Sequence, residues 1–230
     1  LSSDNVAELR LKSFLNSFTN KRYYMNFRNF EKKYFLFPLN QPYDEQLLFR
    51  SPEFKNNFET INLIAKNLPK NTELIVKEHP VNPGMISTRE IKKIKAKFNN
   101  VHFVNPNLNL YSLISKCLGL ITVNSTSGLE ALVHKKNILV LGRGYYRDIE
   151  GVFKYENEQK LKQDLIYIKD NQEGFHNNKD LDIVLQKIIN QTFPRPNHFP
   201  DKKTEHYNTL MEALEFKVKQ LYESSIKKSL

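Results

Sequence analysis

Apolar runs and amphipathic segments alternate regularly between residues 34 and 170. The apolar runs are short and rich in β-branched or aromatic residues, as strands are: Tyr34–Leu39, Glu73–Lys77, Val101–Val104, Leu120–Val123 and Ile138–Leu141. The segments between and after them carry apolar residues at helical spacing: residues 52–67, 88–98, 108–117, 129–134 and 157–170. This alternation predicts a Rossmann-like α/β fold, in which a parallel sheet carries helices on both faces.

The two ends of the chain differ from this central pattern. Residues 1–19 suit a helix, and residues 20–34 combine basic and aromatic side chains that could stack bases, lie on an anionic membrane surface or pack on the domain as a helix. We favour the packed helix with its charges in solvent. Residues 179–190 and 203–225 predict closing helices. We therefore expect a lead-in at 1–33, a Rossmann-like domain at 34–175 and a helical extension at 176–230.

The composition changes this picture in two ways. The formal net charge is +10, from 35 basic and 25 acidic residues, which favours an anionic partner such as a nucleotide, a phosphorylated glycan or an acidic lipid. Charge alone would also permit nucleic-acid binding, which we do not expect. The single cysteine, Cys117, excludes a disulfide within the chain and lies in an apolar helical pattern, so we expect a small buried residue.

The sequence contains no targeting or membrane-spanning pattern. No apolar run approaches the ~18 residues needed to cross a bilayer, and no signal peptide opens the chain. We expect a cytoplasmic protein, with peripheral contact to the inner face of the membrane as a possibility that the basic lead-in raises. The first residue is Leu1 and not Met, so we expect a piece of a longer protein that lacks a preceding domain.

Polar residues gather in the loops that follow four of the predicted strands. These loops are Asn40–Gln46, Lys77–Pro80, Asn124–Gly128 and Gly142–Arg147. In a parallel sheet, loops at the carboxyl ends of the strands lie at one end of the sheet, where α/β proteins bind their ligands. The four loops are therefore predicted to converge on one crevice.

The loop at Asn124–Gly128 is the strongest candidate for anion binding. It leads into a helix, whose first N–H groups and dipole favour a phosphate, and Ser125, Thr126, Ser127 and Gly128 could hold one. The alternative is that a serine only caps the helix. Glu130 follows in the first helical turn, where it could accept hydrogen bonds from a ribose or simply stabilise the helix dipole.

The other loops supply charged groups and possible catalysts. Lys77 and Arg143 could neutralise a phosphate, and His79 could donate to a leaving phosphate or act as a general acid or base. Asp44 is a candidate nucleophile or base, or alternatively a turn cap.

Several familiar motifs are missing from the sequence. It has no P-loop, no GxGxxG run, no zinc-ligand spacing and no Gly-x-Ser-x-Gly elbow. Asp180-Leu-Asp182 matches the DxD metal motif of some glycosyltransferases, but acids at the start of a helix usually cap it. We expect no metal and no other cofactor.

In combination, four stretches resemble the bacterial capsule polysaccharide biosynthesis family. They are Gln41-Pro42 with Asp44 and Gln46, Leu74-Ile-Val-Lys-Glu-His-Pro80, Thr122-Val-Asn-Ser-Thr-Ser-Gly-Leu-Glu-Ala-Leu132 and Ile138-Leu-Val-Leu-Gly-Arg-Gly-Tyr-Tyr146. The resemblance covers about residues 34–155. It implies the C-terminal, nucleotide-sugar domain of a two-domain GT-B glycosyltransferase that transfers Kdo from CMP-Kdo with retention to a glycolipid or polysaccharide acceptor.

The resemblance also implies roles for individual residues. His79 and the 124–128 loop would contact the CMP phosphate, Glu130 the ribose, and Asp44 would be the nucleophile; Gln41, Asn124 and Tyr146 lie in the matching stretches and would line the donor site. A UDP-sugar transferase or epimerase, and a non-catalytic partner in capsule assembly or export at the membrane, remain open as alternatives.

Overall fold

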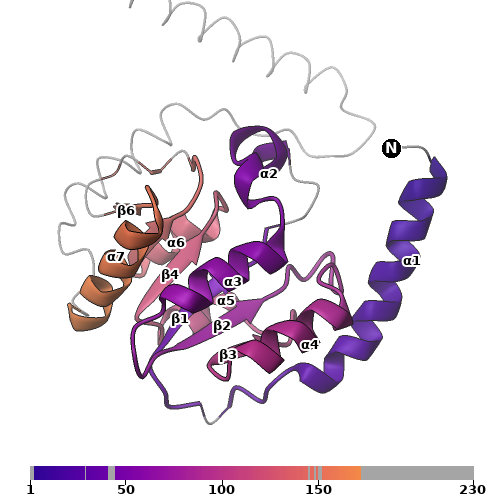
Figure 1. Cartoon of the computed structure of the whole chain (residues 1–230), viewed down its shortest axis with the longest axis horizontal. Coiled ribbons are helices and arrows are strands. Elements are labelled where there is room, and N and C mark those ends of the chain that lie inside the picture. Colours follow the sequence, from indigo (N-terminus) through magenta and orange to yellow (C-terminus); the bar gives the residue numbers. More distant parts are fainter. Residues whose placement is uncertain are drawn as a thin grey trace, which may run out of the picture. The chain divides into compact units, whose positions relative to one another are not determined.

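The computed structural model describes residues 3–28, 30–40, 45–144, 146–147, 149 and 152–171. Within them lies a six-stranded sheet, and every neighbouring pair of its strands is parallel (Figure 1). The strands are β1 (Tyr34–Pro38), β2 (Glu73–Lys77), β3 (Val101–Val104), β4 (Gly119–Thr122), β5 (Asn137–Val140) and β6 (Val152–Lys154). Their order, β3-β2-β1-β4-β5-β6, is that of a Rossmann fold and confirms the predicted class.

The sequence of the strands reflects burial on both faces of the sheet. Every residue of β1, β2, β4 and β5 is buried, so their apolar residues run on instead of alternating with polar ones. Pro38 is the last residue of β1, where a residue without an N–H disturbs the ladder least.

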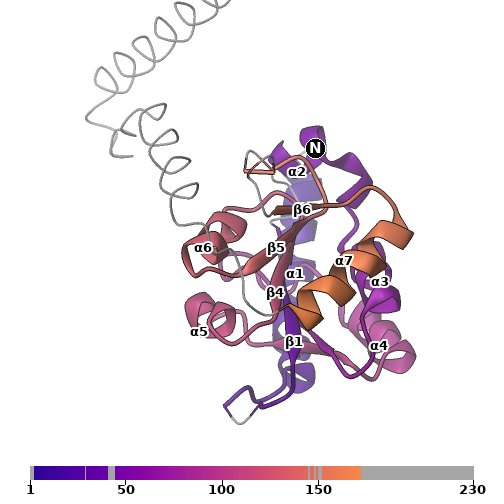
Figure 2. The same cartoon turned by 90° about the vertical axis from the view of Figure 1, so that its left-hand side faces the viewer.

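Helices cover both faces, as predicted (Figure 2). One face carries α3 (Asn57–Asn67), α4 (Thr88–Lys97) and α7 (Glu158–Asp170), and the other carries the short helices α5 (Leu110–Ile114) and α6 (Ser127–Val133). Asparagine side chains cap α3, α5 and α7, whereas a capping box between Ser87 and Glu90 begins α4.

Helix α1 (Ser3–Asn20) packs on the loop that follows β2. Ser13 Oγ donates to the Pro83 carbonyl at 2.7 Å, and Asn16 Nδ2 donates to the Gly84 carbonyl at 3.1 Å. Gly84 has a φ of +80°, and a Cβ there would overlap the backbone of α1, so only glycine allows this approach. The side chains of Leu11, Phe14, Leu15 and Phe18 are exposed on α1.

The basic and aromatic lead-in is not the helix that we predicted. After a 3-10 turn at Lys21–Tyr23, the chain becomes extended: Tyr24 forms a parallel bridge with Phe103, and Met25 N donates to the Phe103 carbonyl at 2.8 Å. The predicted packing through aromatic residues is present, because Phe30 lies edge-on to Tyr34 and to His102. Because β3 lies at the edge of the sheet, it presents unpaired backbone groups. Hydrogen bonds to these groups replace those that the lead-in would have made as a helix.

Three other elements differ from the sequence prediction. Helix α2 (Glu45–Arg50) begins inside the stretch that we expected to be a loop, and β6 was not predicted. The helix expected at 52–67 is a 3-10 turn at Pro52–Phe54 followed by α3, because Asn56 accepts hydrogen bonds from the N–H groups of Phe58 and Glu59 and restarts the helix there. The helices predicted beyond residue 171, with Asp180 and Asp182, lie outside the described residues.

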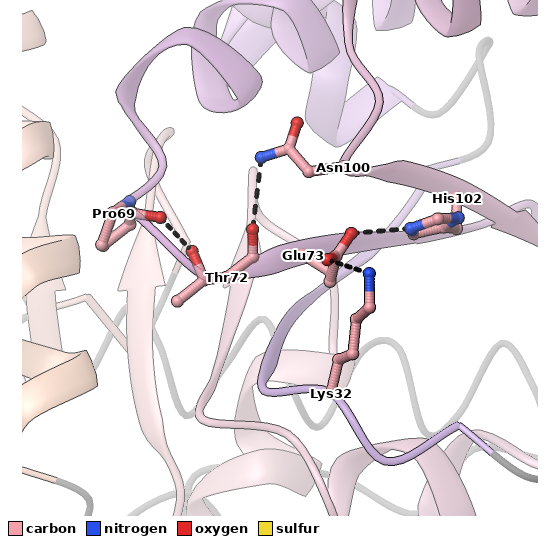
Figure 3. A network of polar contacts seen from close by, with 6 residues as sticks. All are labelled: Lys32, Pro69, Thr72, Glu73, Asn100 and His102. Carbon is pink, nitrogen blue, oxygen red and sulfur yellow. Dashed lines mark hydrogen bonds and ion pairs between the residues drawn. The ribbon is translucent and has the colours of Figure 1, made fainter.

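A network of polar contacts lies at the amino end of the sheet, where the strands begin (Figure 3). Lys32 Nζ donates to Glu73 Oε1 at 2.8 Å, and His102 Nε2 lies 2.7 Å from Glu73 Oε2. Burial would raise the pKa of the Glu73 carboxyl, but the hydrogen bonds from Lys32 and His102 outweigh burial and hold that pKa below its ordinary value.

Candidate functional site

A cavity of about 370 Å³ opens at the carboxyl end of the sheet. Its walls come from the loops after four strands, and its lining residues are Pro38, Leu39, Lys77, Glu78, His79, Pro80, Pro106, Asn107, Leu108, Leu110, Ser125, Thr126, Ser127 and Glu130. The strand order reverses between β1 and β4, so the cavity lies at the topological switch point, where such sheets bind ligands. Two of the four predicted loops, Lys77–Pro80 and Asn124–Gly128, contribute lining residues, whereas no described residue of Asn40–Gln46 or Gly142–Arg147 does, so the predicted convergence of all four loops is wrong in this respect.

The two serines of the β4–α6 loop differ in their hydrogen bonding. Ser125 Oγ accepts a hydrogen bond from Ser127 N, the first N–H of α6, at 3.3 Å, although the N-cap position itself is Thr126, whose side chain makes no capping bond. Ser127 is only 3% exposed, and its Oγ has no hydrogen-bond partner among the described residues. A buried hydroxyl without a partner costs stability, so Ser127 is the residue of this loop whose presence a ligand would explain.

Tyr146 packs against the β4–α6 loop. Its hydroxyl donates to the Ser125 carbonyl, and its ring lies against Gly128 so closely that a Cβ at Gly128 would overlap it. Tyr146 is buried and is not among the residues that line the cavity. Gly128 therefore allows the close contact with Tyr146, and this contact holds the part of the loop that carries Ser125 and Ser127 in position.

Lys77, the last residue of β2, is buried and directed at the protein backbone. Its Nζ donates to the Pro106 carbonyl at 2.6 Å, and burial lowers the pKa of its ammonium group. The contact holds the β3–α5 loop against β2. A phosphate in the cavity would have to share the ammonium group with this carbonyl.

Glu78 is a structural carboxylate that the sequence analysis did not single out. It is 2% exposed and accepts hydrogen bonds from Gly84 N at 2.7 Å, Met85 N at 3.1 Å and the Tyr24 hydroxyl at 3.1 Å. Burial raises the pKa of this carboxyl, although its hydrogen bonds favour the charged form. Glu78 thus shapes the loop that carries His79 and connects that loop to the lead-in.

His79 is half-buried, and the loop selects one of its tautomers. Val81 N donates to His79 Nδ1 at 3.2 Å, which requires Nδ1 to be an acceptor. In the neutral ring the proton then lies on Nε2, which becomes a donor. His79 lines the cavity, so this geometry suits donation to an anionic group of a ligand.

Glu130 lies across the cavity, in the first turn of α6. It is half-buried, and its carboxylate accepts no hydrogen bond from the described residues. Burial raises the pKa of Glu130, while the nearby His134 acts in the opposite direction. A carboxylate in this state can accept hydrogen bonds from hydroxyl groups of a ligand.

The remaining predicted residues have different positions. Asn40 Nδ2 donates to Asn124 Oδ1 at 2.7 Å, and this buried pair joins the ends of β1 and β4. Arg143 is exposed and does not line the cavity; its N–H donates to Ser51 Oγ at 3.0 Å. Gln41 and Asp44 lie outside the described residues.

The sequence analysis missed one wall of the cavity. Pro106, Asn107 and Leu108 belong to the loop after β3, which has the same strand-end position as the loops that we chose. The signal was present, because Asn105 to Asn109 is a run of asparagine, proline and leucine directly after a predicted strand.

Taken together, the cavity is lined by hydroxyl, N–H and imidazole donors and by the Glu130 carboxylate. Such a set suits a ligand that carries both a phosphate and hydroxyl groups. Among the described residues, no group of three or more His, Cys, Asp or Glu side chains is placed to hold a metal ion. In the same part of the chain, no helix is long and apolar enough to cross a membrane.

The strand order and the cavity define a Rossmann-like α/β protein with a candidate ligand site at its switch point. The chain belongs to the family of capsule polysaccharide biosynthesis proteins, whose model matches residues 16–208, so the family predicted from the sequence is confirmed. The chain is 30% identical over 189 residues to the capsule polysaccharide modification protein LipB of Neisseria meningitidis serogroup B, covering 77% of this chain and 43% of LipB. It is 27% identical over 130 residues to the capsule polysaccharide export protein KpsS of Escherichia coli, covering 53% of this chain and 33% of KpsS.

The chain thus spans less than half the length of these two relatives. Among solved structures, it is similar to the β-Kdo 2,7 transferase of Thermosulfurimonas dismutans KpsC, with a TM-score of 0.46, 17% identity and coverage of 79% of this chain and 62% of that one. The UDP-GlcNAc 2-epimerase of Neisseria meningitidis gives a TM-score of 0.45, 18% identity and coverage of 79% and 52%.

Proposed function

We propose that the cavity binds a sugar nucleotide, and that the protein is part of a glycosyltransferase that transfers Kdo from CMP-Kdo during capsule polysaccharide biosynthesis. The observation that carries the proposal is the buried Ser127 hydroxyl, which has no hydrogen-bond partner among the described residues and lies beside a cavity at the switch point of the sheet. Membership of the capsule polysaccharide biosynthesis family supports the choice of a carbohydrate reaction.

The proposal gives each lining residue a part in holding the donor. The single phosphate of the CMP-sugar lies between Ser127 and His79, with His79 Nε2 donating to a phosphate oxygen. Glu130 accepts hydrogen bonds from the ribose diol. Stabilising the negative charge that develops on the departing CMP lowers the barrier to transfer.

Retention of configuration requires two displacements. In the first, an Asp44 carboxylate oxygen bonds to the anomeric carbon as the bond from that carbon to the phosphate oxygen breaks, and CMP leaves with the electron pair. In the second, an acceptor hydroxyl bonds to the anomeric carbon, the ester to Asp44 breaks, and the hydroxyl proton passes to a base. The acceptor is a glycolipid or polysaccharide, and contact with an anionic membrane would bring the protein to a lipid-linked acceptor.

The test is nucleotide binding by calorimetry, together with thermal melting. We expect millimolar CMP to raise the melting temperature, and we expect CMP to bind more tightly than UDP. Ser127→Ala and His79→Ala should each weaken CMP binding by about ten-fold, the loss of one hydrogen bond to a charged group. Ser115→Ala, which removes an exposed hydroxyl outside the cavity, is the matched control.

A melting temperature that does not change with CMP would refute the proposal. Tighter binding of UDP would retain a sugar-nucleotide enzyme but replace CMP-Kdo as the donor. Loss of affinity in Ser115→Ala to the same extent as in Ser127→Ala would show that the measured binding occurs elsewhere.

A further inference from the structure

A second cavity, of about 550 Å³, adjoins the first. Its lining residues are Ser17, Lys21, Tyr24, Met25, Asn26, Pro83, Asn105, Pro106 and Asn107. Pro106 and Asn107 line both cavities, so the β3–α5 loop is a wall that the two share. The opposite wall comes from the lead-in, which is held in place by its bridge to β3 and by Glu78.

The residues that line the second cavity include no carboxylate. Lys21 is their one cation; its Nζ lies 4.6 Å from the centroid of the Phe18 ring, and among the described residues no carboxylate lies within ion-pair distance of it. Asn26 Oδ1 accepts from Arg28 N at 3.1 Å and Asn105 Oδ1 from Asn107 N at 2.9 Å. Their NH₂ groups make no hydrogen bond to the described residues and are left to donate.

Of the remaining lining residues, Ser17 has its hydroxyl bound to the Phe14 carbonyl at 2.7 Å, and the others are largely apolar. The hydrogen bond from the Tyr24 hydroxyl to Glu78 holds the ring, and the bond from Met25 N to the Phe103 carbonyl holds the backbone of Met25. Pro83 and Pro106 are rigid. A preformed cavity that combines apolar walls with amide donors suits a sugar ring, which presents C–H groups and hydroxyls together.

We propose that the second cavity binds an acidic sugar, with its carboxylate at Lys21 and its hydroxyls at the amide groups of Asn26, Asn105 and Asn107. The single cation in a lining without carboxylates selects an anionic sugar over a neutral one. If the first cavity holds a sugar nucleotide, as proposed above, the shared wall places the acidic sugar beside the donor, in the position of an acceptor.

The test compares two trisaccharides of matched size, the acidic trigalacturonic acid and the neutral maltotriose, by NMR titration. We expect the acidic trisaccharide to bind at least about ten-fold more tightly than the neutral one at low salt, since salt screens the charge contribution. Lys21→Ala should remove that preference, and Lys21→Arg should keep it. Lys12→Ala is the matched control, because Lys12 is also exposed but does not line the cavity and is paired with Glu8.

Three results would overturn the inference: equal binding of both trisaccharides to the natural chain, unchanged binding of the acidic one to Lys21→Ala, or equally tight binding of glycerol 1-phosphate, which offers an anion without a sugar ring. CMP affinity separates the two proposals. We expect it to stay within two-fold in Lys21→Ala, and a chain that binds the acidic trisaccharide through Lys21 but does not bind CMP would refute the first proposal alone.

Discussion

Each end of the sheet carries a glutamate, and the two carboxylates differ in their hydrogen bonding and in the direction of their pKa shift. At the amino end, Glu73 has its charge satisfied by Lys32 and His102, and these bonds hold its pKa down. At the carboxyl end, Glu130 accepts no hydrogen bond from the described residues and burial raises its pKa. The difference shows that a glutamate and a histidine close together do not identify a ligand site. Polar groups without partners beside a cavity are the observation on which the proposed site rests.

The loop at the carboxyl end should be the more easily damaged of the two regions. Gly128→Ala would push a methyl group into Tyr146, and we expect it to lower the free energy of unfolding by about 2–3 kcal/mol and to weaken CMP binding. Urea unfolding measures the first effect. Tyr146→Phe keeps the ring and removes the hydrogen bond to Ser125, and it should cost about 1 kcal/mol. Equal stability of Gly128→Ala and the natural chain would mean that the loop is not held by this contact.

At the amino end, Glu73→Gln should lower stability by about 1–2 kcal/mol at pH 7 and leave CMP affinity unchanged. Lys32 is well exposed, so most of the cost comes from His102. Because the folded-state pKa of Glu73 is lowered, its stabilising contribution is present at neutral pH and is lost as the pH falls below about 4.5. The difference between the variant and the natural chain should therefore shrink in acid. Glu156→Gln, at an exposed position, is the control, and a cost that did not change with pH would contradict this account.

Glu130→Gln should show the opposite pH dependence. The pKa of Glu130 is raised in the folded chain, so the natural chain loses stability as the pH rises from about 4.5 through that folded-state pKa, while the variant does not. Unfolding measured between pH 4 and pH 8 should show the variant gaining stability relative to the natural chain, and it should bind CMP more weakly. A variant that lost stability toward neutral pH would show that Glu130 has a partner like that of Glu73.

Ser127→Ala should have the smallest effect on stability. Removing a buried hydroxyl that has no partner among the described residues is expected to change the free energy of unfolding by less than about 0.5 kcal/mol, or to raise it. Thermal melting without ligand measures this. A loss of more than about 1 kcal/mol would show that the hydroxyl is structural, and would remove the observation on which the proposed function rests.

Long, strongly patterned elements could be predicted from the sequence, and short ones could not. β2 and β3 begin and end at the predicted residues, because each is centred on β-branched or aromatic residues that favour a strand. β6 has three residues, of which only Val152 and Phe153 are apolar, too few to show any period. Helix α2 has six residues, fewer than two turns, and its start lay within a stretch dominated by polar residues.

The candidate site could be predicted in position but not in detail. Strand-end placement brought His79, Ser127 and Glu130 to one cavity, since parallel strands end together. Sequence could not show that Lys77 points at the Pro106 carbonyl, or that Tyr146 lies under the loop, because both depend on contacts between segments far apart in the chain. Glu78 and His79 are adjacent in sequence and both line the cavity, yet Glu78 is buried in hydrogen bonds to its own loop and to the lead-in, whereas His79 is half-buried.

The bonds around Glu78 also bear on where the folding unit begins. Asn20 donates to Glu78 and to the Ile86 carbonyl, Tyr24 donates to Glu78, and Thr88 donates to Asn20. A fragment cut just before β1 would contain every strand of the sheet, but it would bury a carboxylate stripped of two of its donors and open the second cavity to solvent. A fragment truncated at that point would therefore keep all six strands but lose the contacts that satisfy Glu78 and close the second cavity.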